Sequence, residues 1–305
     1  MEPDLSDLSE QIALDPQQFI GIPLALIGAV FLSLGAQFQH RGVLKVERNT
    51  TDSVGKGLDL RQLGLLLARP SWVIGTLMLG LAIVFQLTSL YFAPLIVVQP
   101  LGAIALVITS IVNSQVNHVK LNRKSITAIA MCVGGVFLFV GVAAFTAVDK
   151  PVTEAQLIII LAILAVVLVV AAVAFLMLRK HIRALYYVIM AGVLYGFVAT
   201  LAKVVIGRIE QGDFEWLTFL CVIALVAAAA LGAYFVQNAY ASGPPDLVIA
   251  GLTVVDPIVA VLIGITVLGE ASQAPPWAMG IFAVAGAIAV WGVFLLARNH
   301  PQTRL

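Results

Sequence analysis

Residues 155–178 read AQLIIILAILAVVLVVAAVAFLML, a run without a single charged side chain. An α-helix of this length rises by about 1.5 Å per residue, enough to cross the roughly 30 Å hydrocarbon core of a bilayer. A helix of a water-soluble protein is rarely apolar on every face over such a length. The segment therefore predicts a membrane-spanning helix.

Similar runs follow one another along nearly the whole chain. Of its 305 residues, 61% are hydrophobic and 11% are charged, and the mean hydropathy is +1.05. Too little polar surface remains to cover these runs in water, so lipid must cover them. The expected fold class is an all-α integral membrane protein of about nine transmembrane helices. The nine runs are residues 19–42, 71–91, 94–114, 125–147, 155–178, 184–207, 216–238, 245–268 and 277–297.

Lysine and arginine gather in alternate connections between these runs. They cluster in residues 40–70, 115–124 and 179–183 and in the C-terminal tail, whereas the other connections are rich in aspartate and glutamate. Loops rich in lysine and arginine resist translocation and stay in the cytoplasm. The pattern predicts a multi-pass protein of the plasma (inner) membrane, with its N-terminus outside and its C-terminus in the cytoplasm. Nine helices also require termini on opposite faces.

The segments outside the runs give further expectations. Residues 1–18 form an acidic extracytoplasmic tail without the basic region of a secretory signal, and residues 298–305 form a cytoplasmic tail. The cytoplasmic loop 43–70 includes a short charged stretch at 58–69, which we expect to be an interfacial helix.

Two segments share a pattern in which a helix end is followed by a proline-initiated apolar helix with a second proline. The first is residues 91–103, YFAPLIVVQPLGA; the second is residues 240–245, YASGPP, followed by VDPIV at 255–259. In the predicted orientation the two proline helices run in opposite directions, as in an inverted repeat. We expect two transmembrane repeats, 19–147 with four helices and 155–297 with five.

Short motifs in both halves carry a family resemblance. They are Phe92-Ala93-Pro94, residues 97–103 and Leu121-Asn122 in the first half, and Asp256-Pro257 and residues 267–270, VLGE, in the second. With these motifs the chain resembles the drug/metabolite transporter superfamily, of EamA-like type, over nearly its full length. The first half is most similar to the NIPA-type magnesium transporter branch. The resemblance implies a ten-helix transporter fold that lacks one helix of the first repeat. The chain departs from that branch at residues 118–122, HVKLN, where the family usually places a glutamate.

Ionisable groups inside apolar runs are costly and are therefore candidates for function. Asp256 is expected to bind substrate or exchange protons, because Pro257 frees backbone carbonyls beside it. The alternative is a structural role, either as an N-terminal partner of a broken helix or as half of an ion pair. Lys203 either extends to the membrane interface or turns inward, where Asp256 would be its counter-charge. Gln99, before Pro100, is the repeat counterpart of Asp256.

Both prolines are expected to break their helices at the site. Further candidates for a polar lining are Asn238, Gln86, Tyr91 and Tyr195. The alternative for the amides is hydrogen bonding between helices, and for the tyrosines a place at the membrane interface.

The expected function is secondary transport of a small organic metabolite, drug or amphipathic, lipid-linked solute by alternating access, with proton coupling through Asp256. An inward Lys203 would favour an anionic or zwitterionic solute. One alternative, implied by the resemblance, is NIPA-type transport of Mg²⁺ with Asp256 as the metal ligand. The other is a non-transporting membrane scaffold.

An enzyme is not expected. The sequence has no P-loop, no paired intramembrane carboxylates and no cluster of histidine and cysteine, so we also expect no cofactor. The net charge of +1 gives no reason to expect nucleic acid as a partner. The expected partners are a small-molecule substrate and the lipid bilayer, and the protein is expected to be a monomer or homodimer.

Overall fold

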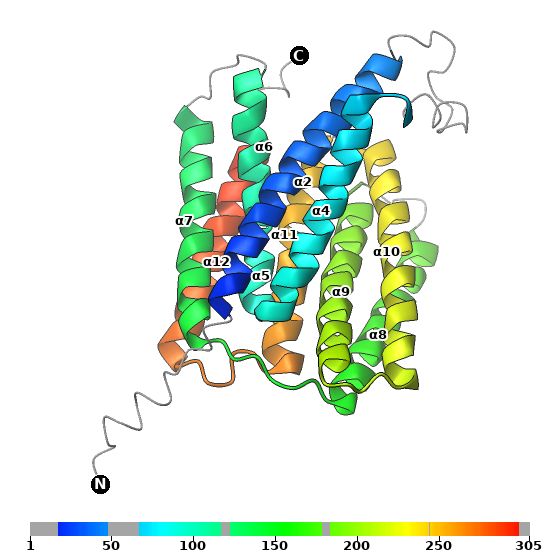
Figure 1. Ribbon diagram of the computed structural model, residues 1–305, viewed down its shortest axis with the longest axis vertical. Helices are drawn as coiled ribbons and strands as arrows, with labels where there is room; N and C mark the ends of the chain where they lie inside the picture. Colours follow the sequence, from blue (N-terminus) through cyan, green and yellow to red (C-terminus); the bar gives the residue numbers. More distant parts are fainter. Residues whose placement is uncertain (1–17, 48–66, 117–122, 179–183, 244, 299–305) are drawn as a thin grey trace.

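The computed structural model describes residues 18–47, 67–116, 123–178, 184–243 and 245–298, which form helices joined by short links (Figure 1). Nine helical segments of this described part are long and apolar enough to cross a membrane, as predicted. The elements are α2 (Gln18–Glu47), α4 (Pro70–Phe92), α5 (Leu95–Leu101), α6 (Ala103–Val116), α7 (Arg123–Thr146), α8 (Glu154–Leu178), α9 (Ala184–Glu210), α10 (Trp216–Ser242), α11 (Pro245–Ile263), η1 (Gly264–Leu268) and α12 (Pro276–Arg298).

Of the two proline-containing spans, one is divided into two helices and the other is continuous through its proline. The first changes from α5 to α6 at Gly102, two residues after Pro100, where the N–H of Gly102 donates to the carbonyl of Gln99. The second continues through Pro257 and ends in the π-helical turn η1. The expectation that Pro257 breaks its helix is therefore wrong. One proline removes a single helical hydrogen bond, and close packing against α9 supports α11 along this stretch.

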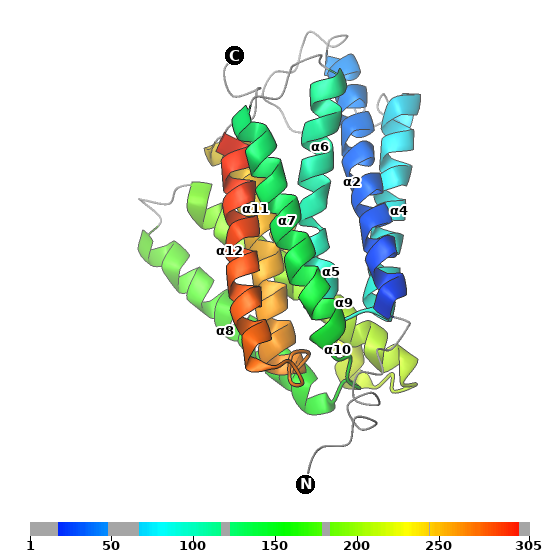
Figure 2. The ribbon, with the colours of Figure 1, turned by 90° about the vertical axis from the view of Figure 1, so that its left-hand side faces the viewer.

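Charged residues separate to the two ends of the bundle. The end that carries the start of α4 and the end of α12 holds Arg69 and Arg298, whereas the opposite end holds Asp149, Glu154 and Glu210 (Figures 1 and 2). This is the alternation that the sequence predicted, while the assignment of the basic end to the cytoplasm stays a prediction. Both expected tails fall largely outside the described residues, as does most of the expected interfacial helix.

Small residues let the most closely packed helices approach each other. The most extensive contacts join α2 with α4, α7 with α12, and α9 with α10 and α11. Gly75 of α4 lies against the backbone of Gln39 in α2, and Gly135 of α7 lies against the backbone of Ala289 in α12. Such contacts give membrane helices their dispersion energy, because lipid supplies no hydrophobic force between them.

We expect Gly135→Val to destabilise the protein, because even a Cβ atom there would lie 2.6 Å from the backbone nitrogen of Ala289. Overpacking of this kind costs about 1–3 kcal/mol, which would lower the melting temperature in detergent by several degrees. The matched control is Gly134→Val, since an added Cβ on Gly134 meets nothing within 4 Å. Equal melting temperatures for the two variants would contradict this account of the α7–α12 contact.

Candidate functional site

A half-open cavity of about 510 Å³ lies between α2, α4 and α5 on one side and α9 and α11 on the other, and its wall includes exposed side chains such as Ile83. Most of its wall is apolar. The polar side chains on the wall are Gln86, Gln99, Tyr195, Thr253 and Asp256. Cavities of roughly 300–1,000 Å³ with a few convergent polar groups are the usual form of small-molecule sites.

Two of these side chains have buried polar atoms without a partner. Neither Oδ1 of Asp256 nor Nε2 of Gln99 makes a hydrogen bond within the described part of the chain. Buried polar groups in native proteins nearly always have a partner, either in the protein or from bound molecules. Both residues line the cavity, although these two atoms each expose less than 1 Å² of surface.

The position of Asp256 follows from the packing of α11 on α9. Glycine at positions 192 and 196 of α9 lets α11 approach closely, and a Cβ on Gly196 would lie 2.9 Å from the carbonyl oxygen of Asp256. Pro257, the next residue, has no N–H, so the carbonyl of Thr253 lacks its usual helical donor. Thr253 and Pro257 also line the cavity.

The other predicted site residues lie elsewhere. Tyr91 is 43% exposed and packs edge-on against Phe92. Asn238 donates from Nδ2 to the carbonyl of Tyr234 within its own helix. Pro100 lines a second, smaller apolar hollow of about 90 Å³, which also touches Pro257. The structure therefore brings together Gln86, Gln99, Tyr195, Asp256 and Pro257, and not Tyr91, Asn238, Lys203 or Pro100.

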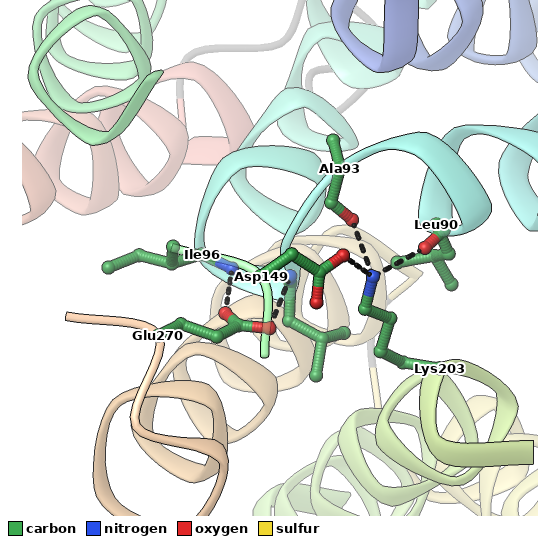
Figure 3. A network of polar contacts seen from close by, with 7 residues as sticks. Leu90, Ala93, Ile96, Asp149, Lys203 and Glu270 are labelled. Atoms are coloured by element: carbon green, nitrogen blue, oxygen red, sulfur yellow. Dashed lines mark hydrogen bonds and ion pairs between the residues drawn. The ribbon is translucent and has the colours of Figure 1, made fainter. Parts of the chain in front are cut away.

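Lys203 turns inward, but its counter-charge is Asp149 and not Asp256. Its Nζ lies 2.5 Å from Oδ2 of Asp149 and donates to the carbonyls of Leu90 and Ala93, at 2.8 and 3.2 Å (Figure 3). These two carbonyls lie at the C-terminal end of α4, where unpaired carbonyls give a helix a partial negative charge. The expected pairing with Asp256 is wrong because this helix end, together with Asp149, offers Lys203 three acceptors at once.

Glu270 holds the beginning of the next helix. Its Oε1 accepts from the N–H of Leu95 and its Oε2 from the N–H of Ile96, both at 2.8 Å (Figure 3). The side chain is 2% exposed, and a carboxylate at a helix N-terminus complements the partial positive charge there. Gly269, with a φ of 70°, makes the left-handed turn from which Glu270 points inward.

Lys203 and Glu270 therefore bind the two sides of the α4–α5 joint, the connection between Phe92 and Leu95. We call the side chains of Asp149, Lys203 and Glu270 the joint network. It draws together the α7–α8 link, α9 and the α11–α12 link (Figure 3). Leu90, whose carbonyl binds Lys203, also lines the cavity, and so does Ala202. The joint network thus borders the cavity at the end of the bundle opposite the basic loops.

Sequence reasoning missed the roles of Asp149 and Glu270. It placed both among the acidic residues of one membrane face, which says nothing about burial. The signal for Glu270 is the pair Gly269-Glu270 directly after an apolar run. Glycine readily adopts a left-handed conformation, so it can end the helix with a sharp turn that directs the next side chain back toward the bundle. Asp149 carries no comparable local signal.

Comparison with known proteins gives one relative without an assigned function. An uncharacterized protein of Corynebacterium glutamicum is 27% identical over 271 residues, which cover 86% of this chain and 90% of the relative. No protein-family model matches the chain. No solved structure matches it either.

We expect stability to depend on pH through Glu270. Burial raises the pKa of Glu270 to about 7, although the N–H groups of Ile96 and Leu95 and the charge of Lys203 favour its ionised form. The folded state therefore binds a proton more tightly than the unfolded state, whose value is near 4.5. The resulting stability, about 3 kcal/mol, is present in full below pH 4.5 and is lost as the pH rises through about 7.

Melting temperatures in detergent between pH 4.5 and pH 8 measure this effect. Wild-type protein should melt at progressively lower temperature as the pH rises, and Glu270→Gln, which cannot ionise, should lack this component. Glu210→Gln, at an exposed position on the same end of the bundle, serves as the control and should follow the wild type. Parallel curves for wild type and Glu270→Gln would show that Glu270 does not titrate in this range.

Proposed function

We propose that this protein is a secondary transporter that carries an organic solute across the membrane by alternating access, as the resemblance to the drug/metabolite transporter superfamily implies. The observation that carries the proposal is the cavity between the helices of the two predicted halves, with Asp256 and Gln99 on its wall and a buried, unpaired polar atom in each of these side chains. A scaffold has no need for such atoms, because polar groups that only join helices would pair with each other.

The helix packing supports two inverted halves. In the proposed correspondence α2, α4, α5 with α6, and α7 match α9, α10, α11 and α12, and α8 is the additional helix. The contacts α2–α4, α2–α6 and α5–α7 then correspond to α9–α10, α9–α11 and α11–α12, all of which are present. Gly21 faces Ala93 in one half and Ala184 faces Gly243 in the other, so even this small-residue contact has a counterpart.

The joint network supplies a closed end for the transport cycle. Lys203 and Glu270 join links and helices of both halves at the border of the cavity. In the proposed cycle these contacts hold that end shut, and their release lets the halves rock around the site at Asp256. Asp256 gives up or takes a proton during the cycle, so that a proton gradient supplies the energy.

Transport of Mg²⁺ has less support from the cavity. This ion prefers several carboxylate or phosphate oxygens and retains its waters. Among the described residues of the cavity wall, Asp256 is the only carboxylate. In the described part of the chain as a whole, no three His, Cys, Asp or Glu side chains gather around a common point.

We expect Asp256→Asn to reduce transport strongly without unfolding the protein, since it removes the charge and nearly keeps the volume. Purified protein in proteoliposomes with an internal pH dye would be challenged with organic cations, organic anions, zwitterions and MgCl₂ side by side. At least one organic solute should drive a proton flux in the wild type and in Glu210→Gln, and Asp256→Asn should lower that flux about tenfold or more. A full flux in Asp256→Asn would rule out the proposed role of Asp256.

We expect Lys203→Met to open the closed end, because methionine keeps the apolar stem but loses all three contacts of Nζ. The reporter is Ala199→Cys, on the cavity wall, in a background with Cys132 and Cys221 replaced by alanine. In intact cells an impermeant maleimide should label this cysteine several times faster in Lys203→Met than in the parent.

The matched control for this labelling is Lys150→Met, at an exposed lysine on the same end of the bundle, which should leave the rate unchanged. The experiment is repeated in inverted vesicles to cover the opposite orientation. If Lys203→Met accelerates labelling in neither preparation, the joint network does not close the cavity.

A further inference from the structure

The cavity between the two halves carries a single charge. Among the described residues that line it, Asp256 is the only aspartate, glutamate, lysine, arginine or histidine. A carboxylate removed from water is costly unless it takes up a proton or meets a positive group. The charge of the wall therefore favours a cation and disfavours an anion.

The buried bases nearest to this region are already engaged. Lys203 is bound by Asp149 and by two carbonyls at the end of α4. Arg208 is bound by Asp213 and by the carbonyl of Val152. Neither base lines the cavity. The sequence-based argument for an anionic solute assumed that Lys203 faces the site, and its engagement elsewhere removes that argument.

The size and the walls of the cavity fit an ion with a carbon body. Apolar side chains such as Ile83, Leu87 and Leu252 make up most of the wall. They cannot replace the water shell that a small metal ion keeps, but they can bury the carbon atoms of an organic ion. Tyr195 lies on the same wall, and aromatic rings attract organic ammonium groups.

The unpaired hydrogen-bonding groups add one more feature. Nε2 of Gln99 is a buried donor without a partner among the described residues, and Gln99 lines the cavity, so a rotation of its amide toward the cavity would let it donate to an uncharged oxygen of the solute. The carboxylate of Asp256, on the same wall, suits the positive end.

We propose that the solute is an organic cation with an apolar body and a neutral oxygen acceptor, its positive group beside Asp256 and its oxygen beside Gln99. This assignment rests on the transport function proposed above and names the substrate class for the same cavity.

Two probes of similar build and opposite charge test the assignment. Benzoylcholine joins a benzoyl group to a quaternary ammonium, and hippurate joins the same group to a carboxylate. Radiolabelled probes and MgCl₂ would be tested separately by equilibrium dialysis against the purified full chain in detergent. We expect saturable binding of benzoylcholine, with a Kd raised about tenfold or more in Asp256→Asn, because the quaternary ammonium loses its counter-charge. In Gln99→Leu the Kd should rise about threefold to tenfold, as for loss of a neutral hydrogen bond. Glu210→Gln should bind as wild type, and elution profiles in size exclusion should show that all variants fold.

The proposal is overturned if benzoylcholine does not bind saturably, if Asp256→Asn binds it as tightly as wild type, or if hippurate or Mg²⁺ competes as the better ligand at Asp256. Proteoliposomes separate this result from the transport function. Binding of benzoylcholine through Asp256 without its uptake would refute transport and keep the cation site. Uptake of hippurate in exchange for protons would refute the cation site and keep transport.

Discussion

The joint between α4 and α5 exposes the backbone groups of two helix ends inside the membrane protein, and charged side chains bind both. In hydrocarbon, unpaired N–H and carbonyl groups cost several kcal/mol each, so irregular backbone persists only where the protein supplies partners. Lys203 binds carbonyls at the end of α4, and Glu270 binds N–H groups at the start of α5. Lys203 thus complements the partial negative charge at the end of α4, and the acidic side chain of Glu270 complements the partial positive charge at the start of α5.

The joint also determines how the cavity is built. If the carbonyls at the end of α4 had no hydrogen-bond partner, the helix would have to continue past Phe92 or fray. In either case α5 could not begin at its present position. With α5 fixed there, Gln99 lies on the cavity wall opposite the half that carries Tyr195 and Asp256. Gln99 is thus positioned by charged side chains that do not themselves line the cavity.

Local sequence was sufficient for the spans but only in part for the site. The nine spans could be predicted because the length and the apolar composition of each run are both properties of that run alone. Gln86, Gln99, Tyr195 and Asp256 could be named as polar residues at depth, and the structure brings them to one cavity. Their neighbours could not be named, because hydropathy gives the depth of a side chain and not the helix that it meets. Asp149 pairs with a residue 54 positions away and Glu270 with residues about 175 positions away, and no local pattern encodes such distances.

The binding of α5 by Glu270 has a consequence for the boundary between the two predicted repeats. By sequence α5 belongs to the first repeat, yet its first turn is attached to the link between α11 and α12, and α7 packs closely on α12 through Gly135 and Gly292. These contacts attach α5 and α7 to the helices of the predicted second repeat, whereas α2 and α4 pack mainly on each other and reach α9 through Lys203. The attachments between helices therefore do not follow the boundary between the two predicted repeats.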